Sequence, residues 1–203
     1  MRRSLLSRRQ RSYMSLLVMI LSFIVWYGQQ QGWFGNVATP VETSQPGLYS
    51  ISRFVDGDTI VVNMSGKDET IRFVGIDTPE THKPNTPVQC YGPTAAAATK
   101  NLISQAGSKV RLDSDSKSTN RDRYDRLLRY VYLPDGTLVN KWLIENGDAF
   151  YYPYFPFTKS ADFKKAEDQA MAAHKGLWGN CTPTPTDQGG YKMDETQAQA
   201  SGQ

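Results

Sequence analysis

The sequence predicts an α+β fold, a five-stranded β-barrel with three α-helices, preceded by an N-terminal hydrophobic signal or anchor helix. Two observations lead to this prediction. Between residues 48 and 181, short runs of β-branched and aromatic residues alternate with three stretches of helical length and period. The elements follow one another as strands, helix, strands, helices. A chain of 203 residues with 39% hydrophobic residues suits one globular domain with appendages.

The N-terminal segment, residues 1–28, has the pattern of a targeting element. Arginines precede an uncharged apolar run from Tyr13 to Tyr27. As a helix this run is about 22 Å long, shorter than the roughly 30 Å hydrocarbon core of a bilayer. It suits a signal peptide or a signal anchor, and both place the rest of the chain outside the cytoplasm. We favour the uncleaved anchor, and hence membrane attachment, because the best cleavage candidate, ending at Ala38, lies far from the run.

Polar segments flank the predicted domain. Residues 29–47 are rich in Gln, Gly, Pro, Ser and Thr and predict a flexible linker. Residues 182–203 are nearly free of aliphatic side chains and predict a disordered tail. Five arginines and one acid precede residue 48, so the net charge of +3 belongs to the N-terminus. The charge therefore says nothing about the ligand of the domain at residues 48–181.

The elements of the domain follow from local patterns. Strands are expected at residues 48–55, 59–64, 70–76, 109–115 and 126–134, and helices at residues 92–106, 138–147 and 160–176. Pro93 suits the first turn of its helix, and Gly107 suits the residue after its end. Ser160 is a plausible N-cap of the last helix. A helix inserted after the third strand favours a small, partly open barrel of the OB type.

Carboxylates gather where two predicted strands meet turns. Asp58 begins the second strand and Asp77 ends the third. If these strands are neighbours, the two carboxylates converge, and a hard cation would remove their repulsion. Ca²⁺ prefers such oxygen ligands and also takes backbone carbonyls, which Thr78 offers. Glu80, one side chain further, suits a group that orients a metal-bound water or accepts its proton.

Two arginines complete this candidate site. Arg72 interrupts an apolar strand, where a charge is costly unless it meets a partner. Arg126 opens the fifth strand, and its guanidinium fork fits phosphate oxygens. A cation and two arginines opposite a water-activating glutamate form a set that can hydrolyse a phosphodiester. For Arg121, Arg123 and Arg129, exposure on strand faces or salt bridges with Asp122 and Asp125 are favoured over catalysis.

Six motifs in the domain resemble the staphylococcal (micrococcal) nuclease, or thermonuclease, family. The resemblance covers about residues 49–179 through VDGDT, RFVGIDTPET, YGPTA, DRYDRLLRYVY, GTLVN and GLW, in the family's order and spacing. It implies an OB barrel and a Ca²⁺-dependent endonuclease that acts on DNA and RNA, preferably denatured or single-stranded, with little sequence preference. By the same resemblance, the metal ligands are Asp58, Asp77 and the Thr78 carbonyl, the phosphate is held by Arg72 and Arg126, and the general base or water-orienting group is Glu80.

Some features leave alternatives open. Asp125 stands where the family often has glycine, and it could pair with Arg126 or Arg123. The family stacks tyrosines on the base, but prolines prevent us from choosing among Tyr151, Tyr152 and Tyr154. Cys90 and Cys181 form a disulfide or remain free. We expect an exported, monomeric nuclease, and the alternative is a non-catalytic OB module that binds nucleic acid or a protein.

Overall fold

The computed structural model describes residues 18–20, 22–23, 27, 47–81 and 87–193. The chain divides into two units, residues 1–40 and 41–203, which are considered separately. The predicted targeting segment, residues 1–28, and the linker lie largely outside the described residues. Among the residues that are described, no helix has both the length and the apolar character needed to cross a membrane.

Five strands form the barrel predicted for the second unit. They close in the order β1-β2-β3-β6-β5, with bounds Tyr49–Asp56 (β1), Thr59–Met64 (β2), Lys67–Phe73 (β3), Lys109–Asp113 (β5) and Leu127–Tyr132 (β6). Only the β3–β6 pair is parallel among these. The barrel is closed, so the prediction of a partly open one is wrong. Two register shifts bend β1 between Ile51 and Asp56, and its first residues can therefore pair with β5.

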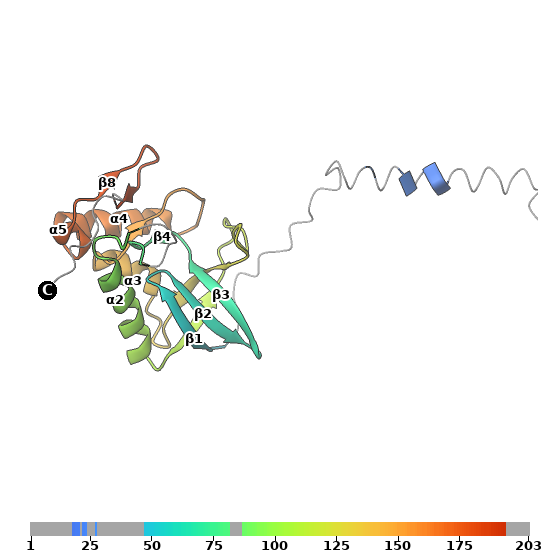
Figure 1. The fold of residues 1–203 in the computed structure, drawn as a ribbon, viewed down its shortest axis with the longest axis horizontal. Coiled ribbons are helices and arrows are strands. Elements are labelled where there is room, and N and C mark those ends of the chain that lie inside the picture. Colours follow the sequence, from blue (N-terminus) through green and yellow to red (C-terminus); the bar gives the residue numbers. More distant parts are fainter. Residues whose placement is uncertain (1–17, 21, 24–26, 28–46, 82–86, 194–203) are drawn as a thin grey trace, which may run out of the picture. The chain divides into compact units, whose positions relative to one another are not determined.

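The three predicted helices are present, and they gather on one side of the barrel (Figure 1). They are α2 (Gly92–Gln105), α3 (Val139–Glu145) and α4 (Ser160–Ala172), and a short α5 (Leu177–Asn180) follows. Pro93 stands in the first turn of α2, as predicted. The capping prediction for Ser160 is wrong, because Lys159 occupies the N-cap position. The Ser160 hydroxyl instead lies 2.6 Å from the Tyr151 hydroxyl and links α4 to the segment before it.

Two further strand pairs lie outside the barrel. The short strand β4 (Ile76–Asp77) pairs with β7 (Phe150–Tyr151). The hairpin of β8 (Thr184–Pro185) and β9 (Tyr191–Lys192) belongs to the stretch for which we predicted disorder. It is ordered because Met193 is buried with Phe150 and Leu177, an aromatic contact that the polar composition did not reveal. Residues 194–203 lie outside the described part of the chain.

The core fills the barrel and the space between barrel and helices. Val62, Ile71 and Val110 are fully buried in the strands, and Leu143 and Phe163 come from α3 and α4. A buried polar residue, Asn140, joins these layers. Its side-chain amide donates to the Val74 carbonyl over 2.9 Å, and its carbonyl oxygen accepts the Val131 N–H over 2.9 Å. α3 is therefore hydrogen-bonded to β6 and to Val74, the residue that follows β3. β3 is the strand that contains Arg72.

Candidate active site

The turn that begins β2 meets the turn that follows β4. Asp58 is only 7% exposed, and its carboxylate accepts the Thr78 N–H over 3.0 Å and the Thr59 hydroxyl over 2.8 Å. The approach is so close that a Cβ added at Gly57 would lie 2.8 Å from the Thr78 Oγ1. Glycine is therefore required at position 57 for Asp58 to reach the backbone of the next turn.

Arg72 binds both predicted metal carboxylates. Its Nη2 lies 3.1 Å from Asp58 Oδ2 and 2.7 Å from Asp77 Oδ1. Its Nη1 donates to the carbonyls of Ile76, over 2.7 Å, and Phe73, over 3.1 Å. The guanidinium is thus surrounded by acceptors, which is why a charge is tolerated in an apolar strand. One nitrogen atom lies within 3.1 Å of oxygens from both aspartates, so these carboxylates face a common point.

Asp77 is the electrostatically strained member of this group. Its pKa is raised to about 7 because protein surrounds the carboxyl group, and the charges of Asp58 and Glu80 add to this effect while Arg72 opposes it. The side chain nevertheless keeps 38% of its exposure, so the carboxyl group remains accessible. Two adjacent carboxylates in such surroundings favour an added positive charge.

Glu80 is held through its backbone. Its N–H donates to Gln89 Oε1 over 2.8 Å, and its carbonyl accepts the Gln89 N–H over 3.0 Å. The negative charge of Glu80 contributes, after larger effects, to the raised pKa values of both Asp77 and Arg72. Gln89 was not singled out from the sequence, since a glutamine after a proline-containing loop carries no recognisable signal.

Arg126 shares a cavity of about 640 Å³ with Arg72. Asp122 orients it: Asp122 Oδ2 accepts the Arg126 Nε–H over 2.6 Å, and Oδ1 accepts the Arg126 backbone N–H over 3.0 Å. Burial raises the pKa of Asp122, but the hydrogen bonds from Arg126 outweigh it, so the pKa lies below its ordinary value. The two predicted phosphate-binding arginines therefore line one cavity, and Asp122 is an orienting residue that the sequence did not identify.

Aromatic side chains also line this cavity. Among the three candidate tyrosines, only Tyr152 does so; its ring lies 5.9 Å from the Arg72 guanidinium and 4.6 Å from the Tyr154 ring. The hydroxyls of Tyr151 and Tyr154 bind Ser160 and Thr186. Tyr124 and Phe155, both about 65% exposed, stand at the same cavity. Tyr124 could have been noticed in the sequence as an aromatic residue between two arginines.

The remaining arginines have structural partners. Arg121 binds Glu69 over 2.9 Å, and Arg123 donates to the Tyr124 hydroxyl over 2.7 Å. Arg129 contradicts the expectation of an exposed strand face: it is 1% exposed and donates to the Asn120 side chain over 2.8 Å. Asp125, at a φ of 65°, pairs with Arg121 over 3.5 Å rather than with Arg126 or Arg123.

The donors at this site suit a hard cation. Within residues 47–81 and 87–193, no group of three or more His, Cys, Asp or Glu side chains forms a metal centre. Oxygens of Asp58 and Asp77 nevertheless both lie within 3.1 Å of Arg72 Nη2, and the buried Thr78 Oγ1 has no hydrogen-bond partner among the described residues. Two carboxylates with hydroxyl and carbonyl oxygens nearby match the preference of Ca²⁺.

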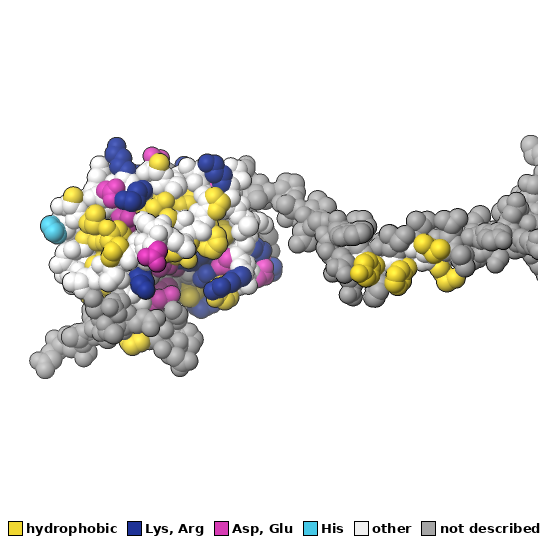
Figure 2. Space-filling view, turned by 90° about the horizontal axis from the view of Figure 1, so that it is seen from above, with side chains coloured by type: hydrophobic (Ala, Val, Ile, Leu, Met, Phe, Trp, Pro, Cys, Tyr) yellow, Lys and Arg dark blue, Asp and Glu magenta, His cyan; other side chains and the backbone are white. Residues whose placement is uncertain are grey.

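The side of the molecule shown in Figure 2 carries charges of both signs. On the side shown in Figure 2, Lys and Arg side chains are interspersed with Asp and Glu among the coloured residues. The cavity, by contrast, gathers basic side chains in one place, since Lys117, Arg121 and Arg123 line it together with Arg72 and Arg126.

Comparisons with known proteins place the chain in a family. Residues 70–180 match the family model described as staphylococcal nuclease homologue. The chain is 41% identical over 135 residues to a thermonuclease of Staphylococcus hyicus, covering 65% of this chain and 76% of that protein. It is 36% identical over 164 residues to a thermonuclease of Staphylococcus intermedius, covering 80% of this chain and 93% of that protein. It is 44% identical over 131 residues to the SPbeta prophage-derived endonuclease YokF of Bacillus subtilis strain 168, covering 64% of this chain and 43% of that protein. The family resemblance noted in the motifs is thus confirmed, and this chain belongs to the staphylococcal nuclease family.

Proposed function

We propose that the domain is a Ca²⁺-dependent endonuclease that hydrolyses phosphodiester bonds of DNA and RNA with low sequence specificity, and that it acts outside the cytoplasm. Hydrolysis of phosphodiester bonds by an endonuclease is the coarse part of this proposal, and family membership carries it. The calcium ion and the residue roles are finer parts that rest on the geometry of the site, and the location is a finer part that rests on the disulfide and the N-terminal sequence.

One observation supports the residue roles most strongly. Arg72 contacts Asp58 and Asp77, and it also lines the cavity that is lined by Arg126, the residue just before β6. The residues that line the cavity include Arg72 and Arg126 but not Asp58 or Asp77. Arg72 therefore joins the two carboxylates to a cavity that holds a second guanidinium, an arrangement that fits a phosphate next to a cation. An OB module that only bound nucleic acid would have no need of two carboxylates paired on one arginine.

Each residue then has a physical task. Asp58, Asp77 and the Thr78 carbonyl would hold Ca²⁺, which when bound supplies positive charge to the phosphate oxygens. Arg126 keeps its Nη groups for phosphate, because the ion pair with Asp122 uses Nε. Arg72 shares its charge between the aspartates and the phosphate. Glu80 orients the attacking water or accepts its proton, while the rings of Tyr152 and Tyr124 offer surfaces for base stacking.

Two features support a location outside the cytoplasm. The described domain contains a disulfide, Cys90–Cys181, and such bonds persist in oxidising compartments. The N-terminal arginines and apolar run are the second feature, although they fall largely outside the described residues. Calcium is abundant in extracellular fluids, where even weak sites are filled.

The proposal is tested by digestion of heat-denatured DNA and of RNA with the purified chain. We expect cleavage with Ca²⁺ and none with excess chelator. Glu80→Gln and Arg126→Ala should each lower the rate about a hundredfold or more while the fold persists. Arg111→Ala is a matched control, because Arg111 pairs with Asp113 away from the cavity residues. Cleavage that continues in chelator would refute the metal role, and binding without cleavage would establish the non-catalytic alternative.

A further inference from the structure

Residues 89–92 form a support beneath the turn that carries Glu80. Gln89 makes two hydrogen bonds to the Glu80 backbone, one through its side chain (2.8 Å) and one through its N–H (3.0 Å). Gly92 packs against the same turn, since a Cβ there would lie 2.9 Å from the Glu80 carbonyl oxygen and 3.2 Å from that of Pro79. The backbone of Glu80 is therefore fixed from outside its own turn.

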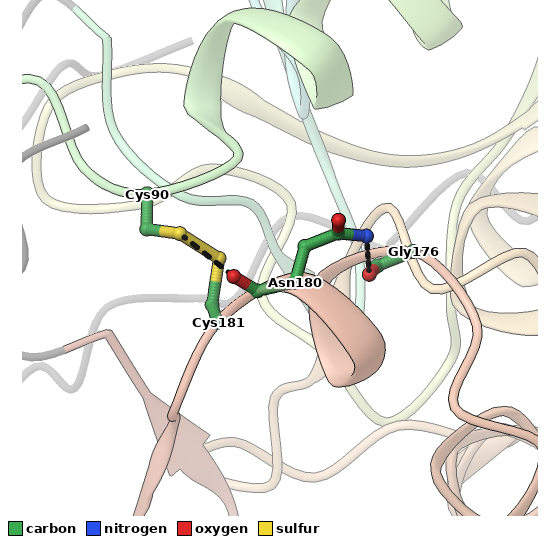
Figure 3. Close-up of a disulfide and its surroundings, with 4 residues drawn as sticks. All are labelled: Cys90, Gly176, Asn180 and Cys181. Atoms are coloured by element: carbon green, nitrogen blue, oxygen red, sulfur yellow. Dashed lines mark hydrogen bonds between the residues drawn. A yellow bond between two sulfur atoms is a disulfide. The ribbon is translucent and has the colours of Figure 1, made fainter. Parts of the chain in front are cut away.

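The support is covalently fastened to the C-terminal part of the domain. Cys90, next to Gln89, is bonded to Cys181, the residue that follows α5 (Figure 3). α5 itself is anchored, because the Leu177 N–H donates to the Gly147 carbonyl over 2.8 Å and Leu177 is fully buried. Displacing the support therefore requires either breaking the disulfide or moving α5, which the buried Leu177 anchors.

The residues around α5 also hold Asp77, which begins the turn that carries Glu80. Phe150 of β7 is buried with Leu177 and meets the Trp178 ring edge-on at 5.5 Å. Phe150 is paired with Asp77 in the β4–β7 ladder. One packed body therefore positions Asp77 through β7 and Glu80 through Gln89, and the disulfide is the covalent connection on the Glu80 side.

We propose that Gln89 and the Cys90–Cys181 disulfide are positioning elements for Glu80. This inference rests on the proposed role of Glu80 toward the attacking water. A general base or water-orienting group loses much of its effect when it is displaced by about 1 Å. Loss of either element should therefore slow the chemical step, whereas the bound phosphate, which contacts the cavity arginines, should be less affected.

The Gln89 test uses two nearly isosteric substitutions in the full chain with Ca²⁺ present. Gln89→Met removes the acceptor for the Glu80 N–H and should lower kcat about tenfold or more, with KM changed less than about threefold. Gln89→Glu keeps an acceptor oxygen and should retain most of kcat. Equal kcat in Gln89→Met and the parent chain, or equal losses in the two variants, would overturn the role of this hydrogen bond.

The disulfide is tested with Cys90→Ala/Cys181→Ala. This variant should show a similar fall in kcat, and a thiol reductant should slow the parent chain but not the variant. Neither Gln89→Met nor the cysteine change should slow the reaction further when Glu80 is already Gln, because each acts through Glu80. A loss of the same size in the Glu80→Gln background would show a merely structural effect and overturn the proposal.

Two controls separate positioning from loss of fold and from failure of the proposed function. Assays are run well below the lowest unfolding temperature among the variants. Val110→Ala, a cavity-forming change in β5, should lower the unfolding temperature of the chain without lowering kcat. Amide hydrogen exchange at Glu80 provides a readout without substrate. Exchange should be faster in Gln89→Met than in Gln89→Glu, and equal rates would refute the support. Absence of cleavage by the parent chain would refute only the proposed function.

Discussion

Glu167 of α4 makes the stability of this domain depend on pH. Its side chain has no solvent exposure, its Oε1 accepts the Tyr151 N–H over 2.9 Å, and its Oε2 has no hydrogen-bond partner among the described residues. Burial raises its pKa from 4.5 to about 7, although the Tyr151 bond and Lys164 act in the opposite direction. Substitution by Gln preserves the acceptor and removes the charge.

The sign of the effect follows from proton binding. Between about pH 4.5 and pH 7 the folded chain holds a proton that the unfolded chain has released, so the free energy of unfolding falls as pH rises. A pKa difference of about 2.5 units corresponds to roughly 3 kcal/mol. In Glu167→Gln the free energy of unfolding does not fall in this way, because glutamine does not titrate. Its free energy of unfolding should therefore approach that of the parent chain near pH 4 and exceed it by about 3 kcal/mol at pH 8.

The assay is urea unfolding of both chains at several pH values, followed by tryptophan fluorescence. Asp168→Asn is the matched control, since its side chain is 50% exposed one position along the same helix. It should shift the curve by no more than about 0.5 kcal/mol. A difference between Glu167→Gln and the parent chain that stays constant from pH 4 to pH 8, or that changes sign, would refute the argument from burial.

Two more substitutions test the local geometry of the site. Asp125→Gly removes a side chain that is 87% exposed and negatively charged, at a left-handed backbone position with a φ of 65°. We expect the free energy of unfolding to rise by about 1 kcal/mol, and kcat/KM to rise about twofold, an effect that fades as salt is added. A loss of stability in thermal unfolding would contradict this expectation. Gly57→Ala places a methyl group 2.8–3.0 Å from the Thr78 side chain, so it should lower the free energy of unfolding by about 1–3 kcal/mol. Thr78→Ala in the same chain should recover part of that loss, because it removes the two closest atoms and leaves the Thr78 Cβ at 3.0 Å. Additive losses measured by urea unfolding would show that the two residues do not clash.

Most of the barrel could be read from local patterns. Runs such as 59–64 and 126–134 are dense in β-branched and aromatic residues, and Pro93 and Gly107 mark the two ends of a helix. The closure of the barrel could not be read, because it depends on β1 bending through two register shifts to reach β5. The β8–β9 hairpin was missed for a similar reason: its order comes from the contact of Met193 with distant Phe150 and Leu177.

The site shows the same division. The sequence showed the types and spacing of Asp58, Arg72, Asp77 and Glu80. They were noticeable because a charged group at the end of an apolar strand costs free energy unless it is paired. The sequence could not show that Arg72 binds both aspartates or that Asp122, rather than Asp125, orients Arg126. Such pairing depends on ångström-scale distances between separate segments.

By itself the sequence determined the five barrel strands, the three long helices, the family and the chemical groups of the site, because side-chain chemistry and local periodicity are properties of short stretches. Only the tertiary structure decided whether Cys90 and Cys181 bond, which tyrosine lines the cavity and how Gln89 supports Glu80. Those contacts join residues that are distant along the chain, and packing alone brings them together.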